Sequence, residues 1–157
     1  MKNNPIRSDT KLVVSRVIQA PCALVFRAWT EPRLMVQWFS PMDVKCHSVD
    51  ADVRIGGAYR LHMISQSGDH VAIGTYQEIV ANRRLRFTWE REDGGPDFPS
   101  TVVTVDFEDL GKTTRLTLTH EGFPTAEDTR DHQEGWTSAL EKFGQLMEQN
   151  KIKADSF

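Results

Sequence analysis

Histidine is the side chain in this sequence best suited to act on or hold a ligand. His120 follows Leu116 and Leu118 at a spacing of two, so it continues the face of a strand that points inward. An inward histidine could orient a ligand or serve as an acid or base, because its pKa lies near neutral pH. The alternative is a structural histidine that is hydrogen-bonded at the end of a strand.

Three other residues carry weaker chemical signals. His132 precedes Trp136 by one helical turn, which places it either on the surface near a helix start or beside the mouth of a pocket. Tyr59 is a second candidate for an acid or base if its ring lies inside. Arg16 is either a charged group beneath a pocket rim or a surface arginine.

The usual catalytic and metal-binding patterns do not occur. The sequence contains neither a GxSxG elbow nor a serine or cysteine with an identifiable His–Asp pair. It has no HExxH and no Cys/His cluster at metal-ligand spacing. Its paired glycines suit turns and do not form a phosphate cradle before a helix. We therefore predict no catalytic residue, no metal and no cofactor.

Length and charge fit one ordinary domain. The chain has 157 residues and a formal net charge of −3, which gives no electrostatic reason for a nucleic-acid or anionic-membrane partner. No apolar run approaches the ~20 residues of a membrane span, and the first residues have no secretory pattern. Cys22 and Cys46 lack CxxC spacing and are predicted to be buried free thiols. We expect a cytoplasmic protein with a single domain at 10–150, between flexible tails at 1–9 and 151–157.

A long amphipathic helix is predicted over residues 125–149. Its apolar face repeats at helical spacing through Trp136, Leu140, Phe143 and Met147. Thr125, three residues before Asp128, predicts the start of the helix. A helix of this length needs a broad apolar surface to lie on.

The remaining sequence supplies that surface as strands. The predicted strands are residues 11–19, 44–53, 58–65, 70–80, 84–92, 101–108 and 113–121. Short turn-forming connections make the last six pair antiparallel, and two short helices begin at Pro21 and Pro32. The second has Trp38 and Phe39 among its apolar members and is ended by Pro41. In the fourth strand Ile79 is opposite in phase to Tyr76, and a bulge near Gly74 would reconcile them. The order predicts an α+β fold in which a twisted sheet curls around the long helix.

Seven strands offer more apolar surface than one helix can cover. Either the two short helices close the remaining gap, or a cavity stays between helix and sheet. The inward, mostly aromatic residues expected to bind a ligand in such a cavity are Trp38, Tyr59, Leu61, Met63, Tyr76, Phe87, Trp89, Val105, Leu118, His120, Trp136, Leu140 and Phe143. The alternative is that these side chains fill a solid core.

Several segments carry a resemblance to a known family. They are RVIQAP (16–21), FRAWT (26–30), QWFSP (37–41), GGAYRLHM (56–63), RLRFTWE (84–90), TRLTLTH (114–120) and HQEGW (132–136). Together they resemble the START-like (SRPBCC) superfamily and, within it, the AHSA1-like branch named after the activator of Hsp90 ATPase. The resemblance runs over about residues 12–147. It implies the helix-grip (START/Bet v 1-like) fold, a curved seven-stranded antiparallel sheet wrapped around the C-terminal helix and enclosing an apolar pocket.

The resemblance leaves function open, because the superfamily includes lipid carriers, polyketide cyclases, hydrolase-like enzymes and chaperone regulators. We expect a binding protein for a small apolar or aromatic ligand, lipid or polyketide-like in character. One alternative is an Hsp90-type chaperone contact, which predicts an exposed patch away from the pocket. The other is a cyclase- or hydrolase-like enzyme that uses His120 or Tyr59. A homodimer is the expected oligomer.

Overall fold

The computed structural model describes residues 10–94 and 99–152. The tail expected at 1–9, residues 153–157 of the tail expected at 151–157, and part of the loop after residue 94 lie outside the described residues. The elements in chain order are β1 (Lys11–Ile18), α1 (Cys22–Thr30), α2 (Pro32–Met35), β2 (Lys45–Ala51), β3 (Ala58–Ser65), β4 (Gly68–Val80), β5 (Arg84–Arg91), β6 (Thr101–Asp109), β7 (Thr114–Glu121) and α3 (Ala126–Glu148).

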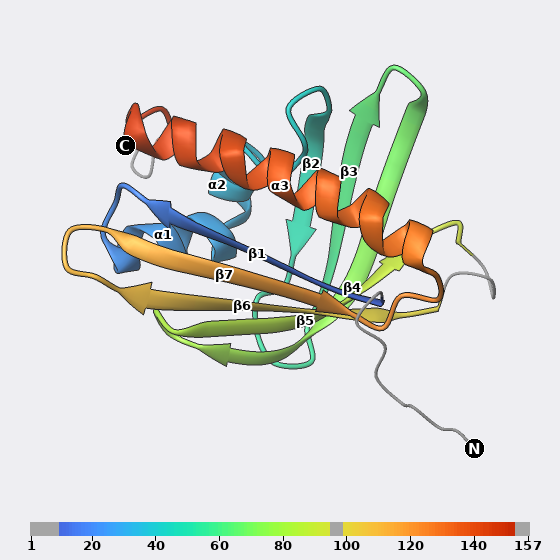
Figure 1. Ribbon diagram of the computed structural model, residues 1–157, viewed down its shortest axis with the longest axis horizontal. Helices are drawn as coiled ribbons and strands as arrows, with labels where there is room; N and C mark the ends of the chain where they lie inside the picture. The colour runs from blue at the N-terminus through green and yellow to red at the C-terminus, as the bar shows by residue number, and fades with distance from the viewer. Residues whose placement is uncertain (1–9, 95–98, 153–157) are drawn as a thin grey trace.

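The strands form one seven-stranded antiparallel sheet in the order β1-β7-β6-β5-β4-β3-β2. Figure 1 shows β1, β7, β6 and β5 running beneath α3, while β2, β3 and β4 rise behind it. The sheet therefore curves around the helix, because each strand is twisted relative to its neighbour. This arrangement confirms the predicted α+β, helix-grip fold.

The helix α3 begins where its capping residues predict. The Thr125 side chain accepts a hydrogen bond from the Asp128 backbone N–H at 3.1 Å, which satisfies one unpaired donor of the first turn. Glu127 and Asp128 add negative charge where the helix dipole is positive. The buried face contains the predicted apolar residues Trp136, Leu140, Phe143 and Met147.

The irregularity in β4 lies three residues beyond its predicted position. The register against β5 shifts between Tyr76 and Glu78, so the bulge is at Gln77 and not near Gly74. The extra residue returns Ile79 to the face of Tyr76, which resolves the conflict of phase in this strand. Gly74 has a different role, because a Cβ there would lie 2.1 Å from the backbone oxygen of Thr88.

The segment around α1 and α2 fills one end of the space between helix and sheet. The helix α2 ends at Met35, so Trp38 and Phe39 follow it and are not part of a longer predicted helix. The Trp29 ring lies 4.7 Å from that of Trp38 and 6.2 Å from that of Phe143, measured between centroids. These aromatic contacts close the C-terminal half of α3 against the sheet.

The two cysteines and the hydropathy of the helices bear on two further predictions from the sequence. Cys22 and Cys46 are buried free thiols, as predicted. Burial raises the pKa of the Cys46 thiol to about 11. None of the helices in the described residues combines the length and hydropathy that a membrane crossing requires.

Candidate functional site

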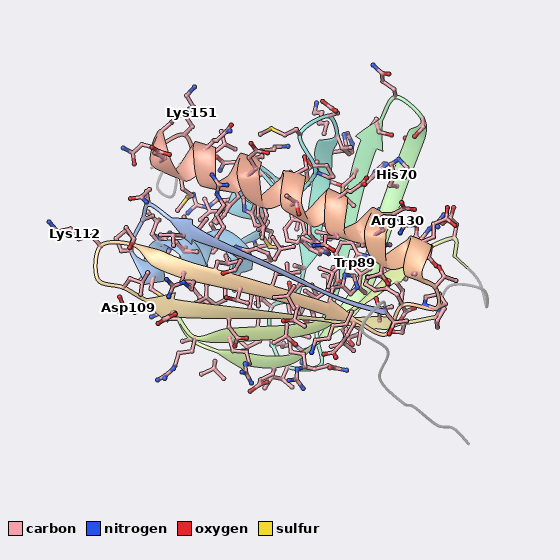
Figure 2. All side chains as sticks on the ribbon, in the orientation of Figure 1. His70, Trp89, Asp109, Lys112, Arg130 and Lys151 are labelled. Atoms are coloured by element: carbon pink, nitrogen blue, oxygen red, sulfur yellow. The ribbon has the colours of Figure 1, made fainter. Side chains whose placement is uncertain are left out.

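A cavity of about 390 Å³ lies between the N-terminal half of α3, the segment after α2, and strands β3, β4 and β5. This volume is at the lower end of the range of small-molecule sites. The residues that line it are Phe39, Ser40, Pro41, Val44, Met63, His70, Trp89, Asp131, His132, Gly135, Trp136 and Ala139. Figure 2 shows Trp89 beneath α3 and His70 on the β3–β4 hairpin. The lining is mostly apolar, and its ionisable groups are His70, Asp131 and His132.

Small residues on α3 keep the cavity open. Gly135 and Ala139 are one helical turn apart and both face the cavity. A Cβ at Gly135 would meet only the Cγ of Pro41, at an ordinary contact distance of 3.9 Å. The helix therefore presents almost no side-chain volume at these two positions.

The opposite wall is tied to α3 by Lys142. Its Nζ donates to Ser40 Oγ at 2.9 Å and lies 3.4 Å from the Val44 carbonyl oxygen and 3.5 Å from that of Pro41. Partial burial lowers the pKa of Lys142 from its ordinary value. The ammonium group thus cross-links the loop at 39–44 to the helix through neutral oxygen acceptors.

His120 lies in the core in a closed hydrogen-bond chain. The Trp136 indole N–H donates to His120 Nδ1 at 2.9 Å, so this nitrogen carries no proton and Nε2 does. Nε2 then donates to Thr101 Oγ1 at 2.7 Å, and that hydroxyl donates to the Trp89 carbonyl at 3.0 Å. Burial, and next the charge of His132, hold the pKa of His120 well below its usual value. Both nitrogens are engaged by protein groups, which fits the structural alternative for this residue.

The Tyr59 hydroxyl is also used in a hydrogen bond within the protein. It donates to the carbonyl oxygen of Thr88. Burial raises the pKa of Tyr59 well above the usual value, and the nearby Tyr76 and Glu90 act in the same direction. The Tyr59 hydroxyl therefore stays protonated at neutral pH, and its proton is already donated to the Thr88 carbonyl.

Arg16 lies away from the cavity. It is part-buried on β1, and a Cβ at Gly144 of α3 would lie 2.3 Å from its Nε. That nitrogen is buried and has no acceptor among the described residues. The side chain therefore packs under the C-terminal half of α3 and does not line the cavity.

The structure divides the sequence-predicted ligand residues into three groups. Met63, Trp89 and Trp136 line the cavity. Tyr59, Leu61, Tyr76 and Phe87 surround a separate void of about 10 Å³. The others are packed in the core and line neither space: Trp38, Val105, Leu118, His120, Leu140 and Phe143. Aromatic side chains of α1 and of the segment after α2 fill the space beside these residues, where the sequence had predicted a ligand cavity.

Sequence reasoning missed most of the cavity wall. The residues not anticipated are Phe39, Ser40, Pro41, Val44, His70, Asp131, Gly135 and Ala139. His132 lies at the cavity, in line with one of its two predicted positions. The available signal was the spacing of Gly135 and Ala139 on the apolar side of α3, since small residues one turn apart mark a hollow or a close approach.

Two other features of the described residues do not form a competing site. No group of three or more metal-ligating side chains comes together in the part of the chain that the structure describes. A hollow of about 840 Å³ with a largely charged lining lies on the outer face near the β4–β5 turn. Several of its charged residues pair with one another, as in the 2.7 Å contact of Arg84 with Asp106 and the 3.0 Å contact of Arg115 with Glu108.

A curved antiparallel sheet closed around a C-terminal helix is the helix-grip architecture of the START-like (SRPBCC) superfamily. Within it, the family model for activator of Hsp90 ATPase homolog 1-like proteins (AHSA1) matches residues 19–148. The chain belongs to this AHSA1 family. Family and fold support a ligand-binding or regulatory domain in general.

Solved structures share the fold over nearly their whole length. A protein from Chromobacterium violaceum is 27% identical with a TM-score of 0.77, covering 88% of this chain and 97% of that chain. One from Nitrosomonas europaea is 25% identical with a TM-score of 0.77, covering 93% and 99%. The AHSA1 protein from Silicibacter pomeroyi, at 22% identity and a TM-score of 0.76, covers 89% and 99% and shows the fold alone. A comparison with functionally curated proteins gave no match.

Proposed function

We propose that this protein binds a small apolar or aromatic molecule in the cavity beside the N-terminal half of α3. The cavity is the observation that supports this function, because its walls combine Trp89, Trp136, Phe39 and Met63 with a few polar groups. Apolar walls with a small number of polar groups are typical of sites that hold small molecules. The family is consistent with such a role but does not name a ligand.

The volume narrows the class of ligand. About 390 Å³ accommodates a compact molecule of one to three rings more readily than a long acyl chain. The indole rings of Trp89 and Trp136, whose centroids are 5.2 Å apart, offer flat surfaces against which a ring can pack. A lipid-like ligand would therefore be a short or cyclic one.

A titration with the neutral fluorophore N-phenyl-1-naphthylamine tests the function. We expect saturable binding with enhanced emission, because the dye leaves water for an apolar site. Gly135→Phe should abolish binding, because the new ring occupies the cavity. Gly135→Ala is the matched control, since its Cβ meets only Pro41 at 3.9 Å and alanine favours the helix.

Dye binding by the wild type and the two variants distinguishes binding in the cavity from binding elsewhere. Binding by the wild type and Gly135→Ala, but not by a folded Gly135→Phe, supports the cavity as the site. Equal binding by all three places the dye elsewhere and contradicts the proposal. Failure of the wild type to bind the dye counts against a permissive apolar site, and circular dichroism shows whether each variant is folded.

A chaperone contact is the second candidate, favoured by the description of the matching family. It requires an exposed surface for the partner, and the large exposed apolar residues of the described chain are scattered over several elements: Val13, Val17, Met42, Ile55, Val80 and Leu110. A direct binding assay with purified Hsp90 would decide it. The homodimer and the cytoplasmic location stay predictions from the sequence.

A further inference from the structure

Trp29 has a hydrogen-bond donor without a partner in the core. Its side chain is 1% exposed, and its Nε1 is buried with no acceptor among the described residues. Two neighbouring indoles differ in this respect. Trp38 Nε1 donates to the Ala28 carbonyl at 2.9 Å, and Trp136 Nε1 donates to His120. Buried donors are nearly always paired, so an unpaired indole N–H indicates a site for an acceptor.

The same indole lines the small inner void. This void, of about 10 Å³, is bounded by Trp29 and Phe39 together with Tyr59, Tyr76 and Phe87. Phe39 also lines the 390 Å³ cavity, so its side chain belongs to the wall shared by the two spaces. The neighbours of the Phe39 ring are themselves aromatic, with centroids 4.5 Å away for the stacked Trp38, 5.4 Å for Trp29 and 5.8 Å for Trp136. A rotation of this ring would break no side-chain hydrogen bond.

We propose that the void behind Phe39 is the inner end of the ligand cavity, and that the Trp29 N–H receives a carbonyl oxygen of an otherwise apolar ligand. This inference rests on the proposed binding function and specifies its ligand as a compact aromatic ketone or a related neutral acceptor. The Phe39 ring moves aside when the ligand enters. The four predicted residues around the void, which do not touch the outer cavity, then contact the ligand directly.

The residues that line the small void favour a ligand whose hydrogen-bond acceptor is neutral. No residue that lines the void carries a charge, and a buried carboxylate without a charged partner would be strongly disfavoured. The Tyr59 hydroxyl is already donating to Thr88. Burial raises the pKa of Tyr76 to about 12, so its hydroxyl stays neutral as well. Trp29 Nε1 is the buried polar atom of this lining that has no partner among the described residues, so it sets the polarity of the group that fits.

Two ligands of nearly the same shape test this inference. 2-Acetylnaphthalene and 2-ethylnaphthalene differ by a carbonyl in place of a methylene, and calorimetry gives both dissociation constants. We expect the wild type to bind the ketone about three- to tenfold more tightly, in keeping with one net hydrogen bond. Without the donor the more apolar hydrocarbon should bind better. Trp29→Phe should therefore remove or reverse the preference for the ketone.

A second readout covers the case in which Trp29→Phe does not fold. In wild-type protein with ¹⁵N-labelled tryptophan, the Trp29 indole N–H resonance should move downfield with the ketone and not with the hydrocarbon. Equal affinity for the two ligands, or ketone binding that leaves this resonance unchanged, overturns the inference while the binding function stands. If neither naphthalene nor N-phenyl-1-naphthylamine binds, the proposed function fails and the inference fails with it.

Discussion

At the scale of single residues, His120 is the centre of a buried hydrogen-bond chain. The imidazole accepts from Trp136 and donates to Thr101, so one tautomer is fixed by its neighbours. Trp136 also lines the cavity, and His120 therefore holds a cavity wall in place from behind. A histidine with these contacts is a positioning residue for the cavity and has no nitrogen left for a substrate.

This arrangement predicts how stability depends on pH. The folded-state pKa of His120 lies below its unfolded value of about 6.5, because burial disfavours the charged ring. The stability contributed by the neutral ring is complete above about pH 6.5 and is lost as the pH falls from there towards the folded-state pKa. The loss should reach up to about 1.4 kcal/mol per pH unit. Urea unfolding between about pH 8 and about pH 5 measures it.

His120→Gln provides the comparison for that measurement. Glutamine keeps an acceptor and a donor near Trp136 and Thr101 but does not titrate. We expect this variant to be less stable than the wild type at pH 8 and to lose less stability on acidification. An identical pH slope in the two proteins would show that groups other than His120 cause the acid sensitivity.

At the scale of elements, the cavity depends on a tie between α3 and the loop that follows α2. Lys142 donates to Ser40, and the Met42 backbone N–H donates to Ser138 Oγ at 2.8 Å. Both ties come from α3 and both end on the segment that forms one cavity wall. The wall should therefore loosen when these contacts are removed, even though α3 and the sheet remain intact.

Lys142→Met tests this tie, because methionine keeps the apolar stem and removes the ammonium group. We expect a loss of about 1.5–3 kcal/mol in the free energy of unfolding, the range for hydrogen bonds to charged groups. Backbone amides at 40–44 should exchange hydrogen faster, and N-phenyl-1-naphthylamine should bind more weakly. Lys112→Met, on the exposed β6–β7 turn (Figure 2), is the control. Unchanged exchange at 40–44 would mean that Lys142 does not hold the wall.

The elements themselves were largely predictable from local pattern. Alternation predicted β3 to the residue, and the Thr125 cap predicted the start of α3, because both signals are written in neighbouring positions. The bulge was misplaced to Gly74 since glycine is the usual local sign of one. Gly74 instead permits a close approach to Thr88, which depends on a strand that is distant in sequence.

At the scale of the whole molecule, the position of the cavity was much harder to predict. Periodicity shows that Met63, Trp89, Leu118 and Phe143 face inward, but it does not show how far along α3 the covering side chains extend. Aromatic residues of α1 and of the segment after α2 fill the space near Phe143 and leave the other end open. That division arises from tertiary packing between segments more than a hundred residues apart in the chain.

We propose that the open end of this helix-grip fold exists to hold a small molecule. The most direct test is native mass spectrometry of protein purified gently from its own host, with Gly135→Phe prepared in parallel. We predict that the wild type carries a co-purifying molecule of defined mass and that the cavity-filled variant carries none. A wild type that appears only at the mass of the bare chain, or an adduct that persists unchanged in Gly135→Phe, would contradict the account.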